Sequence, residues 1–195
     1  MLTREQALAL LDQQGFENGL LHHVLETEAV MRSLAAKLGH DQDLWGLTGL
    51  LHDLDFPRTK DDPARHGLIA AQDLEGRLPE EGLQAIRAHN SEMNGTEATS
   101  VFDYALRCGE TVTGLISANA LVRPQGMQGM KPKSLKKKMK DKSFAANVNR
   151  ERLQECERIG LDLNEFLQVA IGAFETIAGQ VGLEPSPSRS SSESA

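Results

Sequence analysis

With 195 residues, 39% of them hydrophobic, the chain is long enough for one globular domain with a sizeable core but too short for two full ones. Its formal net charge of -7 argues against nucleic acid as a partner. No apolar run approaches the ~20 residues that a membrane-spanning helix needs, and the N-terminal residues do not resemble a signal peptide. Cys108 and Cys156 are isolated in the sequence, so we expect no disulfide framework and a cytoplasmic location.

Apolar residues recur at helical spacing along most of the chain, and no segment shows the alternation of a β-strand. Thr3 and Gln6 have the spacing of a capping box for a short first helix, which Gly15 ends. The later predicted helices span residues 18–38, 44–54, 66–78, 80–90, 96–121, 149–159 and 163–181, with loops at 56–65 and 90–95. The long segment 96–121 is either one helix or two helices joined near Gly109. These patterns predict an all-α fold.

The C-terminal third of the chain contains two segments of unusual composition. Residues 131–142 include seven lysines, and the spacing of Leu135 and Met139 predicts an amphipathic turn with its lysines in solvent. Alternatively, Lys136 and Lys137 bind substrate phosphates or steer anions inward. Residues 184–195 are rich in serine and proline and are predicted to be disordered. We therefore expect a helical domain over residues 1–183, with its core at about 15–155 and its C-terminal helices reaching about 182.

His52 and Asp53 stand side by side at the end of the apolar helix predicted for residues 44–54. Burying a carboxylate there is costly unless a cation or several donors meet it. An imidazole nitrogen and a carboxylate oxygen are ligands suited to a divalent metal. Consecutive helical positions differ in direction by about 100°, so other ligands must come from elsewhere. His23, His66 and His89, each predicted on or at the end of a helix, are the candidates.

This order of residues resembles the HD superfamily of metal-dependent phosphohydrolases, whose pattern is a histidine, then His-Asp, then a distant aspartate on a helical bundle. The similarity spans roughly residues 15–155. The matching pieces are His23 with Glu28-Ala29-Val30-Met31-Arg32, the run Trp45-Gly46-Leu47-Thr48-Gly49-Leu50-Leu51-His52-Asp53-Leu54-Asp55, His66-Gly67, Ala88-His89-Asn90, Thr113-Gly114-Leu115-Ile116 and Lys133-Ser134-Leu135-Lys136-Lys137-Lys138. The resemblance implies a single-domain bundle of the HD type.

The resemblance also implies which residues bind metal. One ion is implied at His23, His52 and Asp53, and a second at His66 and His89. Where the family has its late aspartate, this chain has Glu110, whose carboxylate reaches further. We expect Glu110 to be a metal ligand, and the alternative is a solvated position on the helix. The alternative oxygen donor is Asp103, seven residues earlier on the same helical face.

Each of these residues also has a purely structural interpretation. A histidine on an apolar helical face is often a hydrogen-bonded core residue, and His66 and His89 are alternatively hydrogen bonders at a pocket rim. Asp55 either caps or salt-bridges the following loop, or has a catalytic or supporting role in the site. His22 and His40 are not expected in the site.

The implied cofactor is one or two divalent transition-metal ions, with Mn, Fe, Co, Ni or Zn favoured over Mg or Ca. The implied activity is hydrolysis of a phosphate ester or anhydride at His52 and Asp53, with a small, nucleotide-like phosphorylated substrate. One alternative is a degenerate HD domain that binds a nucleotide and regulates without hydrolysis. Another is a bundle with structural histidines that binds a partner. The oligomeric state stays open.

Overall fold

The computed structural model describes residues 1–185, and within this range it contains helices and no strand. In chain order the elements are α1 (Arg4–Gln13), α2 (Asn18–Leu38), α3 (Gln42–Leu51), α4 (Phe56–Thr59), α5 (Leu68–Asp73), α6 (Glu80–Ala88), α7 (Ser91–Asn94), α8 (Val101–Leu121), α9 (Pro132–Met139), α10 (Arg150–Gln154), the 3-10 helix η1 (Glu155–Ile159) and α11 (Leu163–Ile177). The predicted all-α fold is confirmed. Of the predicted tail, all but residues 184 and 185 lies outside the described range.

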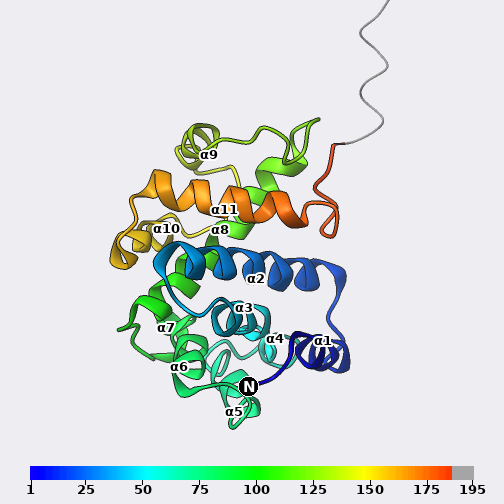
Figure 1. Cartoon of the computed structure of the whole chain (residues 1–195), viewed down its shortest axis with the longest axis vertical. Helices are drawn as coiled ribbons and strands as arrows, with labels where there is room; N and C mark the ends of the chain where they lie inside the picture. Colours follow the sequence, from blue (N-terminus) through cyan, green and yellow to red (C-terminus); the bar gives the residue numbers. More distant parts are fainter. Residues whose placement is uncertain (186–195) are drawn as a thin grey trace, which may run out of the picture.

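Helix α2 lies at the centre of the molecule and packs against α3, α8 and α11 (Figure 1). Its apolar residues Val24, Met31 and Leu34 are fully buried, because helical spacing places them on faces that neighbouring helices cover. The helix spans the predicted residues and ends where Gly39 adopts a left-handed conformation, with φ of 78°. A glycine adopts this conformation without the steric cost of a side chain.

Helix α3 packs tightly against α2 near its C-terminal end, at Gly49. A Cβ atom at Gly49 of α3 would lie 2.9 Å from the Cγ of Met31 and 3.0 Å from the carbonyl oxygen of Thr27. Both neighbours belong to α2, so any larger residue at position 49 would push the two helices apart. The residues of α3 before Gly49 are buried from Leu44 onward. The absence of a side chain at Gly49 allows the last turn of α3 to lie directly against α2.

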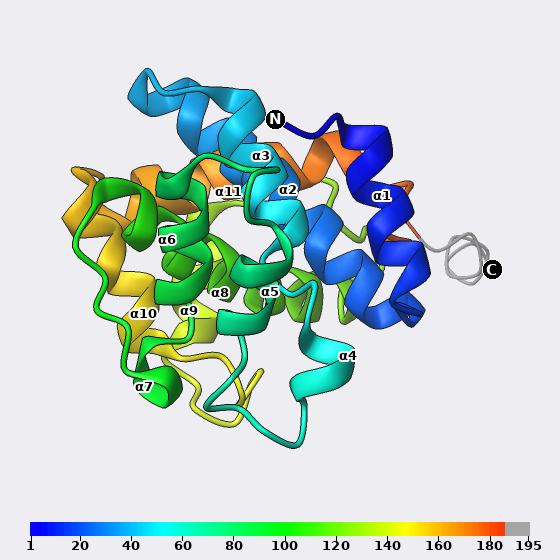
Figure 2. The same ribbon diagram turned by 90° about the horizontal axis from the view of Figure 1, so that it is seen from below.

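Helix α8 is a single helix that continues through Gly109, which decides between the two interpretations of segment 96–121. It begins later than predicted, after Ser100, because Ser100 and Asp103 form a capping box. The Asp103 carboxylate accepts hydrogen bonds from the backbone N–H groups of Thr99 and Ser100, at 2.8 and 2.9 Å. In Figure 2, α5 and α6 lie in front of α8, and α6 packs directly on it.

Several predicted boundaries were wrong. Short helices, α4 and α7, stand where loops were predicted. Helix α5 starts only at Leu68, so His66 lies in the turn before it and not on a helix. The segment predicted as one helix at 149–159 is divided into α10 and η1, and α11 ends at Ile177. Among the described residues, no helix has both the length and the apolar character needed to cross a bilayer.

Candidate metal centre

The His52–Asp53 pair follows directly on α3, which ends at Leu51 and not, as predicted, at Leu54. The ring Nδ1 of His52 donates a hydrogen bond to the carbonyl oxygen of Gly49, at 2.8 Å. In a continuing helix that carbonyl would accept from the backbone N–H of Asp53. The histidine side chain therefore takes over an acceptor at the helix end, and both His52 and Asp53 are buried there.

The first group of potential ligands consists of His23, His52 and Asp53. The Nε2 of His23, on α2, lies 3.2 Å from the Nε2 of His52 and 3.7 Å from Oδ2 of Asp53. The Nε2 of His52 lies 3.2 Å from Oδ1 of Asp53. One ligand atom from each residue lies within 4.8 Å of the other two, so the fold brings together the three residues that the resemblance assigns to one metal.

The second group consists of Asp53, His66 and His89. The Nε2 atoms of His66 and His89 lie 3.2 and 3.5 Å from Oδ1 of Asp53, and 3.0 Å from each other. These ligand atoms also lie within 4.8 Å of one another. Asp53 thus belongs to both groups, and we call the five residues of the two groups the histidine cluster.

Gly67 allows the turn that carries His66 to approach α6. Its φ is 81°, and a Cβ atom there would lie 2.7 Å from the Ile86 carbonyl oxygen and 3.1 Å from Cε1 of His89. Only glycine combines this backbone conformation with so close an approach. The His66-Gly67 motif therefore has a packing reason: it brings the ring of His66 against that of His89.

Hydrogen bonds to Nδ1 fix the orientation of the rings. His89 Nδ1 donates to the Ile86 carbonyl oxygen at 2.5 Å, and His66 Nδ1 donates to Oδ1 of Asp55 at 2.9 Å. Because a carbonyl or carboxylate oxygen can only accept, the proton of each ring must sit on Nδ1. With His52, this applies to three of the four histidines.

The ring of His23 is fixed through Thr113 of α8. The Thr113 hydroxyl donates to the backbone carbonyl of Glu110 at 2.7 Å and lies 2.9 Å from Nδ1 of His23. Since its single proton is used toward Glu110, the Thr113 oxygen must accept from His23. Thr113 is part of a motif in the sequence, but its spacing from His23 gave no sign of this role.

The donor set of the cluster fits a divalent metal. With Nδ1 protonated, each imidazole points its Nε2 toward Asp53, and the Nε2–Nε2 separations of 3.0 and 3.2 Å would set lone pair against lone pair. Such pairs are stable only when a proton or a metal cation lies close to them. A metal cation that replaces the proton between such a pair would meet imidazole nitrogens and a carboxylate, which are ligands that transition metals prefer.

The electrostatics of the cluster also favour positive charge. Burial raises the pKa of Asp53, but His52, His66 and His89 outweigh it and hold this pKa well below its usual range. Burial likewise lowers the pKa of His66, yet its hydrogen bonds to Asp53 and Asp55 raise it to about 9. Burial lowers the pKa of both His23 and His52, which keeps these rings neutral and ready to bind metal.

Asp55 supports the cluster from behind. It is fully buried, and its Oδ2 accepts from the backbone N–H groups of Gly67 and Ala70 at 2.9 and 3.0 Å. Its Oδ1 holds His66. A carboxylate behind a histidine ring is a common arrangement around protein-bound metals. Asp55 therefore both caps the turn before α5 and contacts a ring of the cluster.

Glu110 and Asp103, the two candidates for the late carboxylate, lie outside both ligand groups among the described residues. Oε1 of Glu110 accepts from Nη1 of Arg152 at 2.9 Å and from the hydroxyl of Thr111 at 2.7 Å. Asp103 caps α8. Sequence reasoning missed Arg152, because 42 residues separate it from Glu110 and only the packing of α10 on α8 brings them together. Glu110 as a ligand stays a prediction.

The lysine-rich segment forms α9, an amphipathic helix with Leu135 fully buried. Nζ of Lys136 donates to Oδ1 of Asn164 at 3.0 Å, and Lys137 is exposed. Both lysines are outside the set of described residues that line the pocket beside the cluster. His22 and His40, which were not expected in the site, belong to neither ligand group of the described residues. The ring of His40 stacks on Trp45.

A pocket of about 260 Å³ opens beside the cluster at His23. The His23 side chain is 26% exposed, against 1% for His52, so the cluster meets solvent mainly at His23. The residues that line the pocket are His23, Glu110, Thr111, Thr113, Gly114, Asn147, Val148, Asn149 and Arg152. The pocket is therefore the natural approach to the cluster.

Comparison with known proteins agrees with this geometry. The family model described as HD domain matches residues 20–141, a range that contains every residue of the cluster. The chain belongs to the HD domain family. No curated protein and no solved structure gave a match to the chain.

Proposed function

We propose that the protein is a metal-dependent phosphohydrolase that cleaves a phosphate ester or anhydride of a small, nucleotide-like substrate. The observation that carries this proposal is the position of Asp53, whose carboxylate is shared by two groups of imidazole Nε2 atoms. A carboxylate in that position can hold two metal ions next to each other, as many enzymes that act on phosphates do. Membership of the HD domain family supports the same class of reaction.

Transition-metal ions bound by the cluster would activate a water molecule as the nucleophile and neutralise phosphoryl oxygens. The residues of the chain would hold these ions and orient the rings that bind them. Thr113 and Asp55 fix the rings of His23 and His66, and the burial of His52 keeps bulk water away from the floor of the site. The identity of the substrate as nucleotide-like rests on the resemblance to the family alone.

A phosphate-release screen tests this proposal. Protein loaded with Mn, Fe, Co, Ni or Zn is offered a panel of nucleotides, sugar phosphates and phosphodiesters. We expect at least one class to be hydrolysed, and His52→Ala to abolish the release. His22→Ala is the matched control, because His22 neighbours His23 but lies outside the cluster, and it should retain activity. Metal-loaded protein that hydrolyses nothing in the panel, or an active His52→Ala variant, would reject a phosphohydrolase.

A regulatory module that binds a nucleotide without cleaving it is the second candidate. The ion pair of Glu110 with Arg152 favours it, because this carboxylate is bound by Arg152 and lies outside both ligand groups of the described residues. Nucleotide binding without phosphate release would support it.

As the compartment we propose the cytoplasm, because Cys108 and Cys156 are buried free thiols within the described residues, which suits a reducing environment.

A further inference from the structure

The ion pair of Glu110 and Arg152 lies where the pocket meets the histidine cluster. We propose that this pocket binds the phosphoryl oxyanion of the substrate through Arg152, and that Arg152 then releases Glu110, whose carboxylate becomes available to the metal. The inference rests on the proposed function and adds to it a phosphate subsite and a coupling between substrate and metal.

Arg152 presents the chemistry that an oxyanion needs. Its Nη1 donates to Glu110 at 2.9 Å, its Nε donates to Glu92 at 3.0 Å, and its Nη2 also bonds to Glu92. A guanidinium has five N–H donors in a planar fork, and within residues 1–185 these bonds use three of them. The side chain is 18% exposed. Arginine binds carboxylates and phosphates with the same geometry, so a phosphoryl group is a natural competitor for the place of a carboxylate.

The charge balance around Arg152 requires that one carboxylate leave when an anion arrives. The ion pairs join the carboxylates of Glu92, Glu110 and Glu155 to the guanidiniums of Arg107 and Arg152. Three negative groups thus face two positive ones. A phosphate monoester brings further negative charge into the pocket, which this network cannot accept without repulsion. Moving one carboxylate toward a metal cation removes the repulsion.

Glu110 is the carboxylate that can leave. Glu92 is held by both Arg107 and Arg152, whereas Glu110 bonds Arg152 and the hydroxyl of Thr111. Glu110 is also tied to the cluster side of the pocket, because its backbone carbonyl accepts from the Thr113 hydroxyl that holds His23. Glu110 and His23 line the same pocket, so the carboxylate lies on the side of the pocket that borders the cluster.

The experiment measures metal affinity with and without a phosphate analogue. Mn²⁺ is titrated calorimetrically into chelator-treated full-length protein, with and without methylphosphonate at constant ionic strength. For the wild type we expect methylphosphonate to tighten Mn²⁺ binding roughly tenfold, within the usual range of coupling between sites. The effect is reciprocal, so Mn²⁺ should tighten methylphosphonate binding by the same factor.

Two variants shift the affinities in directions that a merely structural ion pair would not. Glu110→Gln should weaken Mn²⁺ binding, remove the coupling and tighten methylphosphonate binding to the metal-free protein, because Arg152 is freed. Arg152→Gln should lose methylphosphonate binding but tighten Mn²⁺ binding in its absence, because Glu110 is freed. Arg4→Gln is the control: Arg4 also pairs with a buried glutamate, Glu28, away from this pocket, and should keep the coupling.

The outcomes separate this inference from the proposed function. A wild type that binds Mn²⁺ equally well with and without methylphosphonate overturns the inference alone, as does a Glu110→Gln variant that keeps the coupling. A wild type that binds no transition metal overturns the inference and the proposed function together. Thermal melts report whether each variant is folded. If Arg152→Gln fails to fold, Glu110→Gln alone tests the inference: it should bind Mn²⁺ more weakly and methylphosphonate more tightly than the wild type.

Discussion

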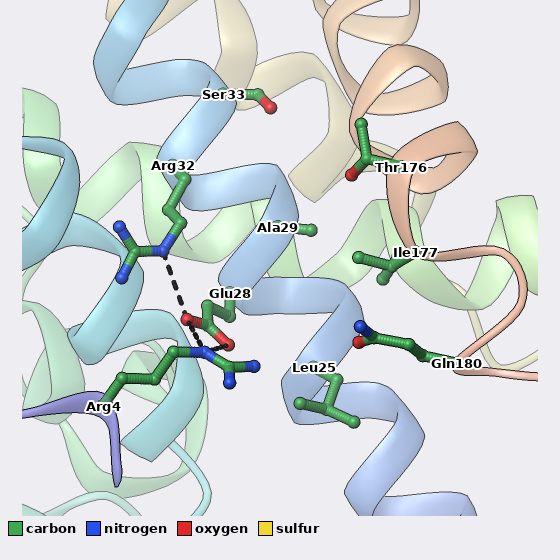
Figure 3. A pocket seen from close by; sticks show the side chains of 9 residues that line it. All are labelled: Arg4, Leu25, Glu28, Ala29, Arg32, Ser33, Thr176, Ile177 and Gln180. Carbon is green, nitrogen blue, oxygen red and sulfur yellow. Dashed lines mark hydrogen bonds and ion pairs between the residues drawn. The ribbon is translucent and has the colours of Figure 1, made fainter.

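Two buried carboxylates of this protein, Asp53 and Glu28, are compensated in different ways. Their side chains are only 10% and 5% exposed. Glu28 lies between two guanidiniums, with Nε of Arg4 at 2.8 Å and Nε of Arg32 at 3.2 Å (Figure 3). Asp53 faces the Nε2 atoms of four histidines, at 3.2 to 3.7 Å.

The difference separates a structural site from a site that could hold a metal ion. Arginine is charged at every physiological pH, so the chain itself neutralises Glu28. Imidazole offers either a proton or a lone pair, depending on conditions, so Asp53 and its four rings can accept a cation from outside. Glu28 also borders a cavity of about 280 Å³ between α2 and α11. Because the charges there are already paired, we interpret that cavity as a feature of the packing.

Removing the charge of each carboxylate in turn should give the largest contrast. Asp53→Asn should abolish metal binding and lower activity at least about 1000-fold, because several kcal/mol of charge stabilisation are lost. Glu28→Gln should leave metal content and activity intact and lower the free energy of unfolding by about 2 kcal/mol, the contribution of hydrogen bonds to charged groups. Metal analysis, kinetics and denaturant unfolding measure these effects. Equal losses of activity in both variants would contradict the assignment of Asp53 to the metal site and of Glu28 to a structural ion pair.

A third buried carboxylate, Glu26, extends the comparison because its hydrogen-bond partner is the neutral hydroxyl of Ser117, at 2.8 Å. Burial raises its pKa to about 7, although the bond to Ser117 opposes this. The folded state therefore binds the proton more tightly than the unfolded state, whose pKa is about 4.5. Stability should fall as the pH rises from about 4.5 to about 7, by up to roughly 3 kcal/mol.

Glu26→Gln should remove this pH dependence and raise the free energy of unfolding at pH 8 by up to about 3 kcal/mol. Denaturant unfolding at several pH values measures the effect, and Glu75→Gln, at an exposed position, is the control. A Glu26→Gln variant that is less stable than the wild type at pH 8 would show that the charged carboxylate is compensated after all.

The support behind the cluster should have the next largest effect. Asp55→Asn removes the negative charge that orients His66 but keeps a similar shape. We expect metal affinity to fall about 10- to 100-fold, the range usual for a residue behind a metal ligand. Calorimetric titration with Mn²⁺ measures it. An unchanged affinity would mean that Asp55 only caps the turn at Gly67 and Ala70.

Helix bounds were predictable where local signals act alone, and less so where side chains intervene. The segment Asn18–Leu38 was predicted residue for residue, because a periodic apolar pattern is followed by a capping glycine. The end of α3 was missed because the His52 ring takes the carbonyl of Gly49, a choice that depends on the packing of the site. The five residues of the cluster could be proposed from their order. The partners Thr113 and Arg152 could not, since tertiary packing alone brings them to His23 and Glu110.

The smallest expected effect concerns the lysines of α9. If they attract anionic substrates over a distance, neutralising Lys136 and Lys137 together should raise KM about two- to threefold and leave metal content unchanged. The difference from the wild type should shrink at high salt, because screening weakens exposed charges beyond about 10 Å at 0.1 M. Steady-state kinetics at two salt concentrations measure it. A salt-independent difference would contradict steering, and an unchanged KM at both salt concentrations would return the lysines to a solvated face.

The stoichiometry of bound metal tests most directly whether Asp53 joins two metal positions. Elemental analysis of purified, metal-loaded protein should find two transition-metal ions per chain in the wild type and in the His22→Ala control. His89→Ala, which removes a residue of the second group only, should retain one ion, and Asp53→Asn should retain none. A wild type that cannot be loaded, or an Asp53→Asn variant that still holds two ions, would contradict the shared carboxylate.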